Sequence, residues 1–227
     1  MRINTEDYKK KGMYLLLSNG HSINLSEENI KRLGDEYWND PAKLPPNIRH
    51  NDDFKTCTVC PFRGQDVLCS AIKPLLPFLE EMESFVSYDK VTAVYLEEEG
   101  LLHVRDTQMQ NALQYVTNMS IFQYCEDMKK YHKYFNGITP FMDSDEIVHR
   151  IFLNVYYLSG GDKEKVNKVI EELLFGMTVT GQGCVKRLNL MCKSDAFKNA
   201  YVKTQVYTMM LSTLDEKDME KYFEKTS

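Results

Sequence analysis

The first informative segment is Met13-Tyr14-Leu15-Leu16-Leu17-Ser18-Asn19-Gly20-His21-Ser22-Ile23-Asn24-Leu25. Two short β-favouring runs flank an Asn-Gly pair, and this is a strong signal for a hairpin because both turn residues tolerate a positive φ. Ser26 then stands where a helix N-cap is expected, with two glutamates directly after it. The sequence predicts a hairpin over 13–25 and a short helix from 27 to about 33.

A second hairpin is predicted over residues 90–106, where two β-favouring runs flank the turn Glu97-Glu98-Glu99-Gly100. Beyond residue 106 the apolar residues recur at the helical period of 3.6. The helices expected there cover about 107–118, 121–135, 143–158, 163–175, 184–192, 195–211 and 215–225. Asp143 and Glu146 open the third of these as a capping box, and glycines separate the fourth from the fifth.

Strands that precede helices are typical of an α+β fold. We expect a small antiparallel sheet of β-hairpins with a cysteine-bound metal in residues 1–106, and a helical bundle in residues 107–227. Between the hairpins, residues 39–56 are expected to be irregular, and Pro74 and Pro77 should divide any helix over 70–82 into pieces. Cys125 would bridge the two parts into one compact unit.

The chemistry of the chain is concentrated in its cysteines. Cys57-Thr58-Val59-Cys60 is a C-x2-C turn that directs two sulfurs to the same side, and Cys69 follows nine positions later. Cys125 is the best fourth ligand for a metal. A redox dithiol at Cys57 and Cys60 is the alternative, although the βαβ context of such motifs is missing. Cys184 and Cys192 are interpreted as packing residues.

Several features recur together along the chain: the hairpin at 14–25, Cys57-x-x-Cys60-Pro61, Cys69, Ser87-Tyr88-Asp89, Gln110, Cys125, Asp143-Ser144-Asp145-Glu146 and Asp195-Ala196-x-x-Asn199-Ala200. In these features and their order the chain resembles an uncharacterised family of bacterial proteins, a domain of unknown function. The resemblance implies a shared cysteine site and supplies no function. In that family proline tends to follow the cysteines, whereas here only Cys60 keeps its proline. This departure weakens any analogy with Cys-Pro iron–sulfur motifs.

A four-thiolate zinc ion would be a structural brace, whereas an iron–sulfur cluster would make the protein a redox or oxygen-sensing protein. The sequence favours zinc, because zinc imposes fewer demands on assembly and no second electron-transfer motif is visible. His132, seven residues after Cys125, and His50, seven residues before Cys57, are candidate substitute ligands or supporting groups for the metal.

Composition limits the function further. The formal net charge of −5 disfavours a nucleic-acid-binding protein. The start of the chain lacks the apolar core of a signal peptide, and no stretch has the ~20 apolar residues of a membrane span, so a cytoplasmic location is expected. No catalytic motif stands out, which favours a non-enzymatic binding or regulatory module over an enzyme with an unrecognised pocket. The C-terminal helices are expected to bind a protein partner or a second copy.

Overall fold

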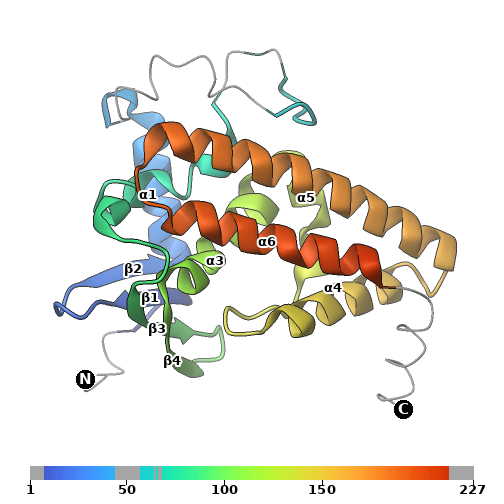
Figure 1. The fold of residues 1–227 in the computed structure, drawn as a ribbon, viewed down its shortest axis with the longest axis horizontal. Helices are drawn as coiled ribbons and strands as arrows, with labels where there is room; N and C mark the ends of the chain where they lie inside the picture. The colour runs from blue at the N-terminus through green and yellow to red at the C-terminus, as the bar shows by residue number, and fades with distance from the viewer. Residues whose placement is uncertain (1–7, 44–56, 64, 66–67, 215–227) are drawn as a thin grey trace.

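Two hairpins form one antiparallel sheet at one end of the molecule (Figure 1). The computed structural model describes residues 8–43, 57–63, 65 and 68–214. Strands β1 (Gly12–Leu16) and β2 (Ser22–Ser26) form the first hairpin, and β3 (Lys90–Leu96) and β4 (Leu102–Gln108) form the second. The strand order is β2-β1-β3-β4, so β1 and β3 join the hairpins. Both predicted hairpins and the α+β class are confirmed.

The first hairpin turns through the three residues Ser18-Asn19-Gly20, which separate Leu17 from His21. The amide of Leu17 donates to the carbonyl of His21 (2.9 Å), and the amide of Gly20 donates to the carbonyl of Leu17 (3.0 Å). Gly20 has φ +85°, whereas no described residue other than glycine has a positive φ. A turn that ends in one left-handed glycine already matches the twist of the strands.

Both faces of the central strand β1 are covered. Met13 and Leu15 are fully buried on the face that joins the main core, and Tyr14 and Leu16 pack with Val94 on the other face. The main core is one cluster of buried side chains that runs from Met13 to Leu211. Residues of the sheet and of the C-terminal helices therefore share one core, which holds the segments between them in place.

Helix α1 (Glu27–Asn39) begins at the predicted cap, where Ser26 Oγ accepts from the Asn29 amide. It continues past the predicted end near residue 33, and Gly34 inside it is a site of close packing, since a Cβ there would lie 3.2 Å from the carbonyl oxygen of Lys73. Four short 3-10 helices follow in the described residues: η2 (Pro41–Lys43), η4 (Ser70–Ile72), η5 (Leu76–Phe78) and η6 (Glu81–Ser84). Residues 70–82 are therefore divided into pieces, as predicted, whereas most of the connection predicted to be irregular, 44–56, lies outside the described residues.

The helical region begins later than predicted and is interrupted. Strand β4 extends to Gln108, so α3 covers Met109–Met119. The single helix predicted over 121–135 is wrong. A π-helical turn, η7 (Ser120–Tyr124), ends at Cys125, whose φ of −67° and ψ of 123° are extended. A 3-10 helix, η8 (Met128–Phe135), follows.

The last three helices are long. Helix α4 (Ser144–Leu158) has the predicted capping box between Asp143 and Glu146. Helix α5 (Lys163–Met191) is continuous, so the two helices predicted over 163–175 and 184–192 are wrong. Its glycines are sites of close packing: a Cβ on Gly176 would lie 2.4 Å from Met128 Sδ. Helix α6 is Ala196–Thr213, and the helix predicted over 215–225 lies outside the described residues.

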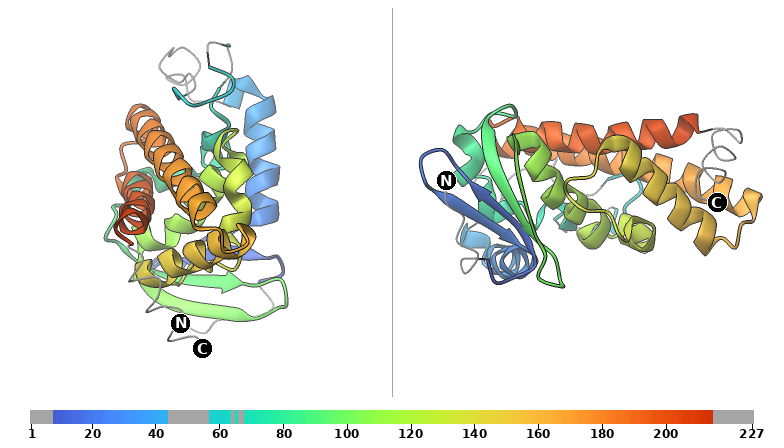
Figure 2. Two further views of the ribbon diagram at one scale, coloured as in Figure 1. Left: turned by 90° about the vertical axis from the view of Figure 1, so that its right-hand side faces the viewer. Right: turned by 90° about the horizontal axis from the view of Figure 1, so that it is seen from below.

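Helices α5 and α6 lie side by side and extend away from the sheet, with α4 beneath them (Figure 2). Helix α6 also packs on α3, which covers the sheet and places the ring of Tyr115 5.6 Å from that of Tyr95. The cysteine segment lies above α5, on the side away from α4 (Figure 1). No helix among the described residues is both long enough and apolar enough to cross a membrane.

Candidate metal centre

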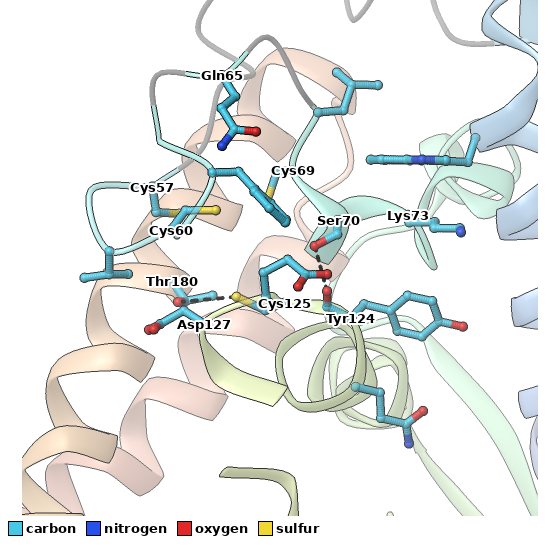
Figure 3. Close-up of a pocket in the computed structure, with 16 residues that line it drawn as sticks. Cys57, Cys60, Gln65, Cys69, Ser70, Lys73, Tyr124, Cys125, Asp127 and Thr180 are labelled. Carbon is cyan, nitrogen blue, oxygen red and sulfur yellow. Dashed lines mark hydrogen bonds between the residues drawn. The ribbon is translucent and has the colours of Figure 1, made fainter. Parts of the chain in front are cut away.

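The four cysteines singled out from the sequence line one cavity of about 400 Å³ (Figure 3). Cys57, Cys60 and Cys69 come from the chain before η4, and Cys125 comes from the break between η7 and η8. The rest of the wall is partly apolar and partly polar, and its members are Trp38, Val59, Phe62, Gln65, Leu68, Ser70, Lys73, Gln123, Tyr124, Glu126, Asp127 and Thr180.

The C-x2-C motif forms the tight turn that its spacing predicts. The amide of Cys60 donates to the carbonyl of Cys57 (3.0 Å), and the amide of Arg63 donates to the carbonyl of Cys60 (3.0 Å). Both thiols are free and only partly buried. The turn therefore presents two sulfurs at the mouth of the cavity.

Hydrogen bonds fasten the turn that carries Cys69 to the chain just before Cys125. Cys69 precedes η4, and its side chain is buried. In that turn the hydroxyl of Ser70 donates to the carbonyl of Tyr124 (2.7 Å), and the hydroxyl of Ser120 contacts the carbonyl of Ala71. These contacts bring two cysteines that are far apart in sequence to the same cavity.

Cys125 lies at the end of a π-helical turn, a distortion often found at functional sites. Its amide donates to the carbonyl of Ser120 (3.0 Å), five residues back, and the chain then becomes extended. Burial raises the pKa of the Cys125 thiol, while the amides of Met128 and Asp127 donate to its sulfur and act in the opposite direction. Its Sγ lies 3.9 Å from Thr180 Oγ1 on α5. Amide donors of this kind stabilise a thiolate.

A buried arginine faces the cysteines from α5. Arg187 is 4% exposed, and its Nη1 lies 3.3 Å from Cys57 Sγ. The pKa of Cys57 is lowered to about 6, first by a hydrogen bond from Cys69 and then by the charge and hydrogen bond of Arg187. The pKa of Cys69 is raised, because its thiol donates the hydrogen bond to Cys57 and because its side chain is buried. The lowered pKa favours the thiolate form of Cys57, the form that binds metals.

Gly183 is the point where the C-x2-C turn rests on α5. A Cβ at Gly183 would lie 2.4 Å from Cys57 Sγ and 2.8 Å from Arg187 Nη1. Contacts that short require a shift of the neighbouring atoms, so a larger residue would displace the side chains of Cys57 and Arg187. This glycine, expected from the sequence to break a helix, instead allows Cys57 to approach Arg187.

Sequence reasoning missed the contribution of α5 to this site. Thr180, Cys184 and Arg187 follow one another at helical spacing, and this pattern was the available signal. Cys184 is fully buried, and burial raises its pKa to about 12, with a further contribution from the charge of Cys57. Cys192 is outside the cavity and lies 3.6 Å from the carbonyl oxygen of Leu79, as expected of a packing residue.

The cysteines surround the cavity rather than meeting at a point. Among the residues that the structure describes, no three cysteine, histidine or carboxylate side chains converge closely enough to hold one metal ion. His132 is exposed and lines a different cavity, together with Tyr95, Tyr115 and Phe135. His132 lies away from Cys125 because the helix is interrupted at Cys125, so the two side chains do not share one helix face. His50 lies outside the described residues.

The other residues that carry the family resemblance have structural contacts. The amide and hydroxyl of Ser87 donate to the carboxylate of Asp195 (2.8 and 3.0 Å), and the side chain of Asn199 donates to the same carboxylate (3.1 Å). The amide of Gln110 donates to the carbonyl of Ser87 (3.0 Å). These residues connect the start of α6 to the start of α3, and none of them lines the cysteine cavity.

Comparison with known proteins identifies a family. A family model described as "Domain of unknown function (DUF6901)" matches residues 19–225, which is most of the chain. Neither the curated proteins nor the solved structures contain a significant match.

Proposed function

The chain belongs to this family of unknown function, and we propose a function from the cavity itself. The protein is an iron–sulfur protein whose cluster is held by Cys57, Cys60, Cys69 and Cys125. The observation that carries the proposal is that these four cysteines, from two distant parts of the chain, line one cavity of about 400 Å³. Cysteine thiolates are the usual ligands of such clusters, and the cluster supplies one-electron or oxygen-sensitive chemistry when bound.

We place a cluster before one zinc ion, which the sequence ranked first, because the described residues contain no group of three convergent ligands. A tetrahedral zinc ion with Zn–S bonds of about 2.3 Å holds its sulfurs about 3.8 Å apart. In the described part of the chain no three candidate ligands converge in that way. A cluster places iron and sulfide between its cysteines, so cysteines around a cavity suit it better.

The surroundings of the cavity can compensate the negative charge of several thiolates. Arg187 is buried beside Cys57, and the amides of Asp127 and Met128 donate to Cys125. Groups of this kind orient metal ligands and raise the reduction potential of iron–sulfur centres by stabilising the more negative state. Trp38, Phe62 and Leu68 add apolar surface that limits access of water.

A structural zinc ion is the second candidate. The observation that favours it is the position of the site, where the C-x2-C turn, the segment around Cys125 and helix α5 meet. A metal at such a point would lower the freedom of three segments at once and stabilise the fold. The protein would then be a non-enzymatic binding or regulatory module in the cytoplasm, as the sequence suggests.

The test is metal analysis of the protein purified without oxygen. The cluster predicts brown protein with iron and acid-labile sulfide, and visible absorbance that is lost in air. Zinc predicts colourless protein with about one zinc per chain. Protein that contains neither metal, even after anaerobic reconstitution with iron and sulfide or with zinc, would contradict both candidates.

Variants locate the ligands. Each of the four changes Cys57→Ser, Cys60→Ser, Cys69→Ser and Cys125→Ser should lower metal content and thermal stability together. Cys192→Ser is the matched control, since Cys192 is a buried cysteine outside the cavity. If Cys125→Ser kept its full metal content, the fourth ligand would have to be another group, such as Cys184, His50 or His132.

The association surface expected on the C-terminal helices stays a prediction. Val202, Val206 and Met209 are exposed at helical spacing along α6, and Met209 is 69% exposed. Apolar side chains that share one helix face support a contact with a partner or with a second copy.

A further inference from the structure

A second cavity, of about 210 Å³, lies where four elements meet, apart from the cysteines. Its walls come from β4, α3, α6 and the start of α4, together with the loop that precedes α4. The residues are Arg105, Thr107, Asn111, Gln114, Pro140, Phe141, Met142, Asp143, Ser144, Lys203 and Tyr207. None of them lines the cysteine cavity.

Lys203 is a partly buried cation in this wall. Its ammonium group donates to Asn111 Oδ1, and burial alone lowers its pKa. In the part of the chain that the structure describes, Lys203 forms no ion pair with a carboxylate. A cation that has lost water without gaining an opposite charge is unfavourable, so an anion beside it would restore the missing interaction.

Arg105 adds a second cation at the rim. It is exposed on β4, and its Nη1 donates to the carbonyl of Phe141 (2.9 Å). This bond holds the loop before α4 against the cavity and engages one of the five N–H groups of the guanidinium. No described carboxylate forms an ion pair with Arg105 either.

Two hydroxyl groups in the wall have protons available for a ligand. Tyr207 is buried, and its hydroxyl accepts a hydrogen bond from Gln114 Nε2. The hydroxyl of Thr107 accepts one from Asn111 Nδ2 (3.1 Å). Neither hydroxyl donates to another described group, so each can donate into the cavity. The carboxylate of Asp143, in contrast, caps α4 by accepting from the Glu146 amide (2.8 Å).

We propose that this cavity binds a small anion with a carboxylate or phosphate group, with Lys203 as its main charged contact and Arg105, Thr107 and Tyr207 as further donors. A small number of polar groups that converge in a concave site is typical of ligand pockets. A volume of about 210 Å³ is below the range of drug-sized pockets, and this limits the ligand to a small molecule or to one group of a larger one.

The test uses the full chain and two defined probes, inorganic phosphate and succinate. Calorimetric titrations are run at constant ionic strength, with sodium chloride as the reference salt. The proposal expects saturable binding of at least one probe, and the stronger of the two identifies the preferred group. Bound anion should also raise the melting temperature as its concentration increases.

Lys203→Gln should weaken that binding by about tenfold or more, because a charge-assisted hydrogen bond is replaced by a neutral one. Lys198→Gln is the matched control: it removes the same charge from α6, but Lys198 donates to the carbonyl of Lys193 and does not line the cavity. Arg105→Gln, at an exposed position, tests the site without risk to the core.

The proposal is overturned if neither probe binds saturably, or if Lys203→Gln and Arg105→Gln both bind as tightly as the native chain. Cys125→Ser should bind the anion unchanged, since the two cavities share no residue. This keeps the result independent of the metal proposal.

Discussion

Arg187 and Cys57 are 130 positions apart in the sequence, yet Nη1 of the guanidinium lies 3.3 Å from the thiol sulfur. The contact joins helix α5 to the C-x2-C turn, and it places a buried positive charge beside the cysteine cavity. The pKa values of Cys57 and Arg187 both respond to it: that of Cys57 is lowered and that of Arg187 is raised. Each of the following predictions tests a consequence of this arrangement or of the surfaces around it.

Gly183→Ala should reduce metal content while the protein stays folded. In an exposed helix this change would stabilise the protein by about 1 kcal/mol. Here the new Cβ would lie 2.4 Å from Cys57 Sγ, so that sulfur has to move from its native position. Metal per chain and melting temperature are the measurements. Gln182→Ala, at the exposed neighbouring position, is the control. Full metal content in Gly183→Ala would refute the close contact.

Arg187→Met should raise the pKa of Cys57 in metal-free protein. The native pKa of about 6 results first from the Cys69 hydrogen bond and then from Arg187, so loss of Arg187 should move it part of the way towards the ordinary value of 9.0. Thiolate reacts with iodoacetamide and thiol does not. The pH midpoint of alkylation at Cys57, read by mass spectrometry, should therefore shift upward. Lys186→Met, which removes a charge from α5 outside the cavity, should leave the midpoint where it is.

Cys184→Ala distinguishes a supporting cysteine from a ligand. Cys184 is fully buried, and its pKa of about 12 opposes the thiolate form. We expect the variant to keep its metal and to lose about 1 kcal/mol of unfolding free energy from the small cavity it creates. Chemical denaturation and metal analysis measure the two effects separately. Loss of the metal in this variant would make Cys184 a ligand in place of one of the other four.

Met209→Lys tests the association surface on α6. If the chain pairs with a second copy through this face, native protein should have a mass above 26.5 kDa in light scattering, and the variant should be monomeric. Gln182→Lys, at an exposed polar position on α5, is the control. A native mass of 26.5 kDa at all concentrations would exclude self-association and would leave a different protein as the expected partner.

Local signals in the sequence determined the hairpins at 12–26 and 90–108, the Ser26 cap and the capping box at Asp143. They did so because turns and caps depend on a few neighbouring residues. The C-x2-C turn also follows from its spacing alone. The spacing of the cysteines, and the expectation that they stay reduced, were enough to single out residues 57, 60, 69 and 125 as a candidate site.

Tertiary packing decided the remainder. Gly176 and Gly183 would be expected to break α5 if they were judged by propensity, but contacts with Met128 and Cys57 make them sites of close approach in a continuous helix. The π-helical turn that ends at Cys125 depends on the neighbouring segment, through Ser70 and Ser120. Arg187 and Lys203 acquire their roles from burial beside groups that are remote in the sequence. Contacts of this kind join segments that are far apart in the sequence, and a local sequence pattern does not specify which distant segments will meet.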